Sequence, residues 1–343
     1  MRETLLGKTP EELKEIVLGL GLPAFAGKQL ARWMYVRKVC DIDSMTDISK
    51  AGRERLKEAC DLGVTVPSGC QVSRDGTKKY LFPLGEGNAV EAVMIPDEDR
   101  KTLCVSSQAG CRMGCKFCMT GRQGFHGHLS VAEILSQFIA IDESDGLTNA
   151  VFMGMGEPLD NWKAVSRAIE VLTADWGFGW SPKRITLSTI GVLPDLKKFL
   201  DSTRCHLAVS LHNPFADERA EIMPVQKAWP LEEVVDMIRQ YDFTGQRRVS
   251  FEYTMFSGLN DDKRHADALI RLLKGLECRV NLIRFHKIPD APYETSPQFV
   301  MENFRDRLSN HGITCTIRAS RGEDILAACG MLAGEHRKKI KPD

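Results

Sequence analysis

From residue 101 onward, short runs of β-branched and apolar residues alternate with amphipathic helical patterns. Each run has the length of a buried strand, and each pattern between two runs repeats its apolar positions with the period of an α-helix. This alternation predicts βα units with a parallel sheet inside and helices outside. Six units rather than eight predict an α/β fold, a partial (β/α)6 TIM-like barrel. Strands are expected at 102–107, 149–154, 184–189, 206–211, 249–256 and 280–285, with one more at 314–319, and helices near 131–143, 162–175, 192–203, 230–243, 262–276 and 297–311.

The first hundred residues follow other patterns. Thr9, Pro10 and Glu12 mark a helix start, because a capping residue, a proline at the first helical position and a glutamate at the third support one another. Two more helical patterns reach residue 60, and strands are expected on both sides of Gly85-Glu86-Gly87. We therefore expect an N-terminal helical domain of the RNA-binding type at 1–65, a β-hairpin connector at 66–99, the barrel core domain at 100–330 and a basic C-terminal tail at 331–343.

Composition narrows the class of protein. Of the 343 residues, 43% are hydrophobic and 27% are charged, which is ordinary for a globular protein, and no apolar run reaches membrane-spanning length. The first residues lead directly into a polar helix signal, so we expect no secretion signal. Eleven cysteines without such a signal indicate a reducing compartment and functional thiols. The expectation is a cytoplasmic monomer without a membrane partner.

Any nucleic-acid surface must be local, because the 46 basic and 46 acidic residues cancel. Residues 101–132 contain four basic residues and no acidic one, which suits an anion nearby. The tail at 336–341 is also basic, although such a run can equally be a solvated end. Phe25, Trp33 and Tyr35 could stack on bases, but their helical spacing favours a place in the core.

Three cysteines stand close together, Cys111, Cys115 and Cys118, with the spacing C-x3-C-x2-C. Thiolates at this spacing are typical of ligands to a metal or an iron–sulfur cluster rather than of packing residues. Structural zinc sites usually have four protein ligands, whereas a cluster held by three thiolates keeps one position open for chemistry. The alternative is a zinc site whose fourth ligand is His126 or His128.

Further polar residues follow the predicted strands at their C-terminal ends, where sites form in parallel α/β folds. Glycines allow the backbone to approach a ligand closely, and Glu157 can accept a hydrogen bond from an ammonium group. Ser188 and Ser210 can bind hydroxyl or carboxylate groups. Each residue alone is weak evidence, and their shared position at one rim is stronger. The candidates at this rim are Gly156, Glu157, Ser188, Ser210, Leu211, His212 and His286.

The cysteine motif, with Phe117 before its last cysteine, resembles the signature of radical S-adenosylmethionine (SAM) enzymes. This resemblance implies a [4Fe–4S] cluster on the three cysteines, with SAM bound to its free iron and to the rim. Residues 104–108, 154–159 and 327–330 narrow the resemblance. Together they closely resemble the RlmN/Cfr family, radical-SAM methyltransferases that act on an adenine of large-subunit ribosomal RNA. The similarity covers nearly the whole chain.

The resemblance implies a two-stage reaction that uses two SAM molecules per turnover. One SAM methylates Cys329, and a radical formed from the second removes hydrogen from that methyl group. The methylene radical adds to the adenine, the adduct loses a proton to Glu91, and Cys104 attacks the Cys329 sulfur, which releases the product and leaves a disulfide. The strand pattern alone would have Glu91 face outward; the resemblance makes it the proton acceptor.

Two details separate the types within this family. Pro158 and the run Arg321-Gly322-Glu323 resemble the RlmN type, which modifies carbon 2 of an adenine in the peptidyl-transferase centre of 23S rRNA, and the adenine 3′ of the anticodon in some tRNAs. The alternatives are Cfr-type carbon-8 methylation and, from another class, a non-catalytic zinc-bound RNA-binding module. The partners implied are RNA and a reductant such as flavodoxin or ferredoxin. His286 stands where many members have asparagine, and histidine can still hydrogen-bond to SAM.

Overall fold

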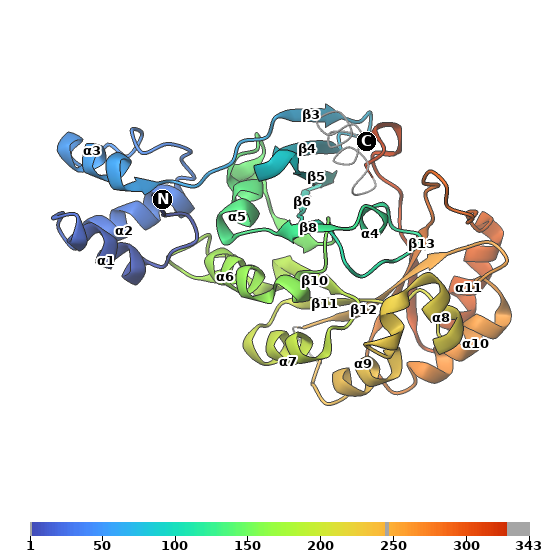
Figure 1. Cartoon of the computed structure of the whole chain (residues 1–343). Coiled ribbons are helices and arrows are strands. Elements are labelled where there is room, and N and C mark those ends of the chain that lie inside the picture. Colours follow the sequence, from blue (N-terminus) through green and yellow to red (C-terminus); the bar gives the residue numbers. More distant parts are fainter. Residues whose placement is uncertain (1, 244–246, 328–343) are drawn as a thin grey trace.

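A ten-stranded mixed sheet forms the centre of the computed structural model, which describes residues 2–243 and 247–327. Seven of its strands run parallel in the order β14-β13-β12-β11-β10-β9-β6 (Figure 1). These strands are β6 (Arg100–Cys104), β9 (Asn149–Phe152), β10 (Ile185–Thr189), β11 (His206–Ser210), β12 (Val249–Met255), β13 (Arg279–Arg284) and β14 (Thr314–Ile317). The six predicted strands and the seventh are confirmed, and the sheet stays open, as a partial barrel does. The chain leaves the sheet after Cys104, earlier than predicted.

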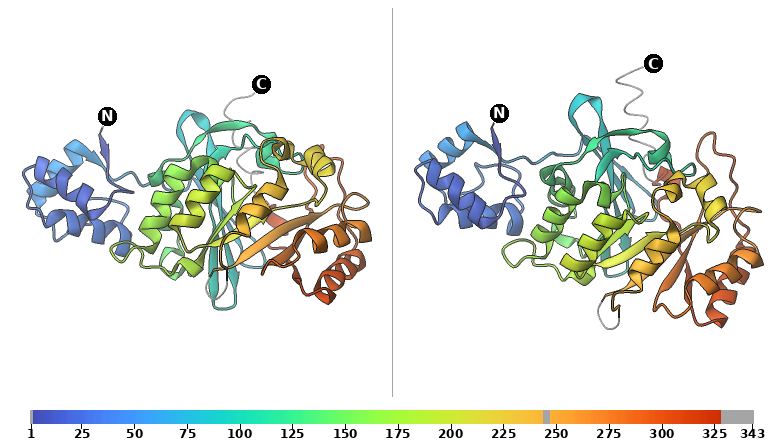
Figure 2. Two further views of the ribbon diagram at one scale, coloured as in Figure 1. Left: turned by 90° about the horizontal axis from the view of Figure 1, so that it is seen from below. Right: turned by 60° about the horizontal axis from the view of Figure 1, so that its bottom comes forward.

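Helices cover the outer face of this curved sheet (Figures 1 and 2). They are α5 (Val131–Ile139), α6 (Trp162–Thr173), α7 (Leu193–Ser202), α9 (Leu231–Ile238), α10 (Lys263–Leu272) and α11 (Gln298–Asn310). The predicted capping box begins α5: the hydroxyl of Ser130 accepts from the N–H of Glu133 at 3.2 Å, and the carboxylate of Glu133 accepts from the N–H of Ser130 at 2.7 Å. Within the described ranges, no helix combines the length and the apolar character needed to cross a membrane.

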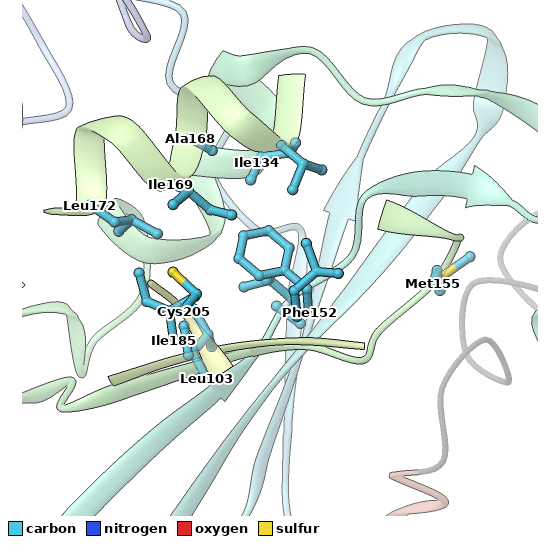
Figure 3. Packing of buried hydrophobic residues seen from close by; sticks show 14 of the residues in the cluster. Leu103, Ile134, Phe152, Met155, Ala168, Ile169, Leu172, Ile185 and Cys205 are labelled. Atoms are coloured by element: carbon cyan, nitrogen blue, oxygen red, sulfur yellow. The ribbon is translucent and has the colours of Figure 1, made fainter. Parts of the chain in front are cut away.

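The core between sheet and helices is apolar and closely packed. Leu103, Phe152 and Ile185 from three adjacent strands lie against Ile134 of α5 and Ile169 of α6, and all five side chains are buried (Figure 3). Burying a side chain of this size contributes about 1.5–3 kcal/mol. This layer therefore fixes the strands whose C-terminal ends carry the candidate site.

The predicted hairpin connector is a three-stranded antiparallel extension of the same sheet. Its strands are β3 (Gly69–Val72), β4 (Lys78–Pro83) and β5 (Ala89–Asp97), and a short 3₁₀ turn occupies Gly85–Gly87. The pattern predicted the second and third of these strands but not the first. β5 pairs antiparallel with β6, with Val93 opposite Cys104. Residues of the connector therefore share a face of the sheet with residues of the barrel.

The N-terminal domain lies at one side of the barrel, near α6 (Figures 1 and 2). Its elements are β1 (Glu3–Thr4), α1 (Pro10–Gly19), α2 (Ala26–Ala31), a π-helical turn (Arg32–Val36), α3 (Lys50–Ala59) and β2 (Cys60–Asp61). Trp33 and Tyr35 are buried, as their spacing favoured, whereas Phe25 is 62% exposed. Phe25 is thus the one of these three aromatic side chains that is free to meet a base. An ion pair of 3.0 Å between Glu12 and Arg167 of α6 joins the domain to the barrel.

Candidate active site

The three cysteines lie in a loop that is held by a two-stranded hairpin, which the sequence pattern did not predict. The elements around the loop are β7 (Gln108–Gly110), α4 (Met119–Arg122), β8 (Phe125–His128) and, further along the chain, α8 (Ala216–Ile222). The N–H of Cys111 donates to the carbonyl of Gly124 at 2.9 Å, and the N–H of Lys116 donates to the carbonyl of Ile222 at 2.9 Å. Gly110 has a φ of 74°, and an added Cβ would lie 1.9 Å from the Gly124 carbonyl oxygen. Only glycine therefore fits where the loop begins.

A buried arginine on α8 supports this loop. Arg219 is fully buried and donates to the carbonyls of Leu211 at 3.0 Å and Ser210 at 2.9 Å. Burial lowers the pKa of Arg219 to about 10, and the nearby Cys115 thiol opposes that shift. The guanidinium remains charged at neutral pH, so α8 places a cation beside the cysteines. No sequence motif marked Arg219.

The contacts of the two nearby histidines favour an iron–sulfur cluster over a zinc site with a histidine ligand. Burial raises the pKa of the Cys111 thiol to about 12 and that of Cys115 well above its usual range. Such thiols ionise when a metal binds them. His126 hydrogen-bonds to a backbone carbonyl at 2.9 Å and His128 to a glutamine side chain at 3.1 Å, so both candidate fourth ligands have other partners. Within the described ranges, no three His, Cys, Asp or Glu side chains are grouped as a metal site, so Cys111, Cys115 and Cys118 stay predicted ligands.

Glu157 is buried directly after β9, and several donors hold its carboxylate. It accepts hydrogen bonds from the N–H of Leu159 at 3.1 Å, the hydroxyl of Thr189 at 2.6 Å and the N–H of Ile190 at 3.0 Å. A carboxylate offers about four acceptor positions. Three of them are used here, and the remaining one could accept a hydrogen bond from a cationic ligand.

The loop that contains Glu157 packs on β7. Gly156 has a φ of 97°, and an added Cβ would lie 2.5 Å from the Cβ of Gln108. Gln108 also donates to Asp160 at 2.7 Å, and Asp160 pairs with Arg112 of the cysteine loop at 2.9 Å. The sequence pattern suggested that this glycine lets the backbone approach a ligand. In the structure it lets the backbone approach β7. These contacts fix the Glu157 loop relative to the cysteines.

The protonation of Glu157 gives a testable pH dependence. Burial raises the pKa of this carboxyl from its ordinary 4.5 to about 7, and the hydrogen bond from Thr189 partly offsets the shift. The folded chain therefore binds this proton more tightly than the unfolded chain, so the carboxyl's contribution to the free energy of unfolding falls as pH rises from about 4.5 to 7 and then levels off. In cluster-free protein, Glu157→Gln should reduce this fall by up to about 3 kcal/mol. Urea unfolding at a series of pH values measures it, and equal slopes in both proteins would contradict the assignment.

Four predicted residues lie at the ends of β10 and β11: Ser188, Ser210, Leu211 and His212. Because β10 pairs parallel with β9 and β11 pairs parallel with β10, the four residues lie at the same edge of the sheet as Glu157. The Nδ1 of His212 accepts from the N–H of Thr254 at 2.9 Å. Burial lowers the pKa of His212 to about 3, so the ring is neutral and carries its proton on Nε2. The ring centroid of Phe117, in the cysteine loop, lies 4.8 Å from that of His212.

Cys104 lies on the wall of a cleft of about 560 Å³. Strands β5 and β6 form one wall, and residues 316–321 form much of the other. His286 lines the same cleft and is 42% exposed, with the hydroxyl of Ser320 at 3.3 Å from its Nε2. Of the rim candidates in the described ranges, only His286 lines this cleft. The structure thus groups His286 with Cys104 rather than with the other predicted pocket residues.

Glu91 faces the same side of the sheet as Cys104. Val93 lies opposite Cys104, and Glu91 precedes Val93 by two residues, so the three side chains share one face. Glu91 is 1% exposed, and its Oε2 lies 3.7 Å from the Nζ of Lys79. The outward position that the strand pattern favoured is therefore wrong: the carboxylate is buried beside a cation on the next strand.

Cys329 and the basic tail at 331–343 lie outside the described residues. The described chain reaches Ala327, and both Leu326 and Ala327 line the cleft that contains Cys104. A close approach of Cys329 to Cys104 stays a prediction.

Two family descriptions match the chain. Residues 4–62 match the ribosomal RNA large subunit methyltransferase N-terminal domain, and residues 105–269 match the Radical SAM superfamily. The first match lies within the helical domain, and the second contains the cysteine loop and the rim.

Several proteins are similar to this chain over almost its full length. A probable dual-specificity RNA methyltransferase RlmN of Porphyromonas gingivalis (strain W83) is 61% identical over 329 residues, which cover 96% of each chain. The dual-specificity RNA methyltransferase RlmN of Syntrophus aciditrophicus is 40% identical over 329 residues, which cover 95% of this chain and 94% of that protein. A crystal structure of a radical SAM methyltransferase from Sphaerobacter thermophilus matches with a TM-score of 0.91 at 37% identity, covering 96% of this chain and 98% of that one.

Proposed function

Because the chain belongs to the RlmN family of radical-SAM RNA methyltransferases, we propose that it methylates carbon 2 of an adenine in the peptidyl-transferase centre of 23S rRNA. We further propose that it methylates the adenine 3′ of the anticodon in some tRNAs. Family membership rules out the alternative of a non-catalytic zinc-bound module. The observation that supports the mechanism is that Cys104 and Glu91 share one face of the sheet, beside the segment that leads to Cys329.

Cys111, Cys115 and Cys118 would hold the [4Fe–4S] cluster that the family implies. When reduced and with SAM bound, this cluster would supply the chemistry of a 5′-deoxyadenosyl radical. Glu157 would accept a hydrogen bond from the SAM ammonium at its remaining acceptor position. The proposed SAM pocket consists of Gly156, Glu157, Ser188, Ser210, Leu211, His212 and His286. The placement of His286 on the Cys104 cleft supports a contact near the reacting end of the pocket rather than beside the serines.

Three side chains carry the proposed reaction, which uses two SAM molecules per turnover. Cys329 exchanges its thiol proton for the methyl group of the first SAM. After a hydrogen atom is removed from this S-methyl group, its carbon bonds to carbon 2 of adenine. The adduct then gives up one proton to Glu91 and one electron, for which the oxidised cluster held by the three cysteines would be the acceptor. The Cys104 thiolate then attacks the Cys329 sulfur: an S–S bond forms, the S–C bond breaks, and the released carbon takes up a proton to become a methyl group. Reduction by an external thiol restores both cysteines.

A radical route suits the target atom. Carbon 2 of adenine is electrophilic and has no lone pair with which to attack the methyl group of SAM directly. Carbon–carbon bond formation therefore needs a carbon radical on the enzyme and, afterwards, a base for the ring proton. The buried Glu91, on the same face of the sheet as Cys104, would supply a carboxylate for that second step.

The proposed partners follow from this chemistry. RNA phosphates would meet the exposed basic side chains of the cysteine loop and its flank, among them Lys116 and Arg122. A one-electron reductant such as flavodoxin or ferredoxin would reduce the cluster. We propose that the enzyme acts as a monomer, because one chain carries all the groups that the reaction uses.

Product analysis tests the function. Reconstituted enzyme, SAM and a reductant are incubated with unmodified 23S rRNA and tRNA, and the nucleosides are analysed by mass spectrometry. The expected product is 2-methyladenosine from both RNAs. Formation of 8-methyladenosine would instead support Cfr-type chemistry, and an enzyme that cleaves SAM but methylates neither RNA would contradict the proposal.

Replacing Glu157 tests the SAM pocket. Glu157→Ala removes the proposed ammonium acceptor, so the dissociation constant for SAM should rise by roughly tenfold to a hundredfold, while iron content stays unchanged. Equilibrium dialysis with labelled SAM measures the constant. Glu170→Ala, at a partly exposed position on α6, is the matched control and should bind SAM like the wild type. Unchanged SAM affinity in Glu157→Ala would remove Glu157 from the pocket.

A further inference from the structure

A buried lysine joins the proposed proton acceptor to the segment that leads to Cys329. Lys79 of β4 is 1% exposed, its Nζ lies 3.7 Å from Oε2 of Glu91, and it donates a hydrogen bond of 2.6 Å to the carbonyl of Leu326. A buried cation is costly unless it is paired. One side chain here serves two partners that are about 235 residues apart in the sequence, at positions 91 and 326.

The segment 321–327 is also attached to the sheet by contacts that do not involve Lys79. In the β3–β4 turn, Asp75 accepts from the N–H of Gly322 at 2.9 Å, and Asp324 accepts from the N–H of Arg74 at 3.1 Å. These contacts lie at the protein surface, where Asp75, Arg74 and Asp324 are exposed. Lys79 contacts the same segment from the interior. Its burial beside Glu91 therefore calls for a role in addition to fastening the segment.

We propose that Lys79 is a positioning residue, which keeps Glu91 ionised for proton uptake and holds the backbone leading to Cys329 beside it. The inference rests on the proposed function, in which Glu91 accepts the proton of the Cys329-bound adduct. When Glu91 takes up this proton, its carboxyl becomes neutral and its attraction for Lys79 weakens. Lys79 then retains the carbonyl of Leu326 as its main partner. The bond to Leu326 therefore stays in place at the step in which Cys329 must react with Cys104.

Lys79→Met tests this coupling, because it keeps much of the side-chain volume and removes the charge. In the reconstituted enzyme with RNA, the amount of 5′-deoxyadenosine formed per methylated adenosine should rise by about tenfold, since the radical still forms but proton uptake falters. Glu91→Gln should raise the same ratio. A purely structural defect would lower both products together and leave the ratio unchanged.

Hydrogen exchange provides a readout that does not depend on catalysis. The amides of residues 322–327 should exchange faster in Lys79→Met than in the wild type, because the bond to Leu326 is lost. Lys78→Met is the matched control: Lys78 is the neighbouring residue on the other face of β4 and pairs with Glu143 at 2.5 Å. This control should change neither the product ratio nor the exchange of the segment.

The double variant Lys79→Met/Glu91→Gln covers the case in which the loss of the Lys79 charge beside the buried Glu91 prevents folding, because it removes both buried charges. If Lys79 acts through Glu91, the double variant should have the product ratio of Glu91→Gln alone. An unchanged ratio in folded Lys79→Met, additive effects in the double variant, or unchanged exchange at 322–327 would each overturn the proposal. A wild-type enzyme that makes no methylated adenosine would refute the proposed function itself, and this inference with it.

Discussion

Replacing Cys104 with alanine should leave RNA covalently attached to Cys329, whereas replacing Cys329 should leave no attachment at all. Both variants lose product, but for different reasons. Cys329→Ala has no sulfur to methylate, so no bond to the RNA can form. Cys104→Ala keeps methyl transfer and radical addition and loses only the thiol that breaks the S–C bond. The placement of Cys104 on the cleft that Leu326 and Ala327 also line supports this division of roles.

Denaturing gels of protein purified with its native RNA measure the adduct. Cys104→Ala should give a band that nuclease removes, and the double variant with Cys329→Ala should give none. The control is Cys205→Ala, which should turn over normally. Cys205 is a buried free thiol directly before β11, at the end of that strand away from Ser210 and the rim. The two reacting cysteines must be able to bring their Cα atoms within about 7 Å, since a disulfide spans no more. A methylated Cys329 with an intact cluster and no RNA adduct in Cys104→Ala would contradict the mechanism.

Alanine at Cys111, Cys115 or Cys118 should abolish iron binding and SAM cleavage together. A cluster on three thiolates has no spare protein ligand, so each substitution removes a third of the donors. Iron and sulfide analysis after anaerobic reconstitution, with detection of 5′-deoxyadenosine, checks both losses.

The control for these variants is Cys278→Ala, a half-buried thiol between α10 and β13. It should keep full iron content, because the Cys278 side chain belongs to another part of the fold. A cysteine-loop variant that retained the full complement of iron would show that its residue is not a ligand.

Local patterns predicted most of the barrel because the interactions that shape those elements are local. The capping box of Ser130 and Glu133 lies within four residues, and apolar periodicity marks the helices that cover the sheet. The hairpin of β7 and β8 was missed because its strands are short and bracket a glycine-rich loop. Helix α8 was missed for a similar reason: it has only seven residues, of which two are buried.

Site residues that belong to a sequence motif could be predicted. Site residues that are recognisable only by their burial and their distant partners could not. The cysteine spacing and the rim position of Glu157 could be recognised in the sequence. Arg219 and Lys79 could not, because a buried cation is defined by partners that come from distant elements. Glu91 was noticed in the sequence but was placed wrongly on its strand. The strand pattern favoured an outward carboxylate, but β5 is buried on both faces, so neither face of this strand offered Glu91 a solvent-exposed position.

The contacts between the β3–β4 turn and segment 321–327 bear on how the chain folds during synthesis. Ser73 and Asp324, which are hydrogen-bonded, stand 251 residues apart. At a synthesis rate of about 5–20 residues per second, roughly 12 to 50 seconds separate their appearance. The local antiparallel strands can form early, but Lys79 gains its carbonyl partner only when the segment arrives. A nascent chain that stops short of residue 320 would thus have an assembled antiparallel sheet, but the Cys104 cleft would lack the side that residues 316–321 form. Quality-control proteases can distinguish such a state from the mature enzyme.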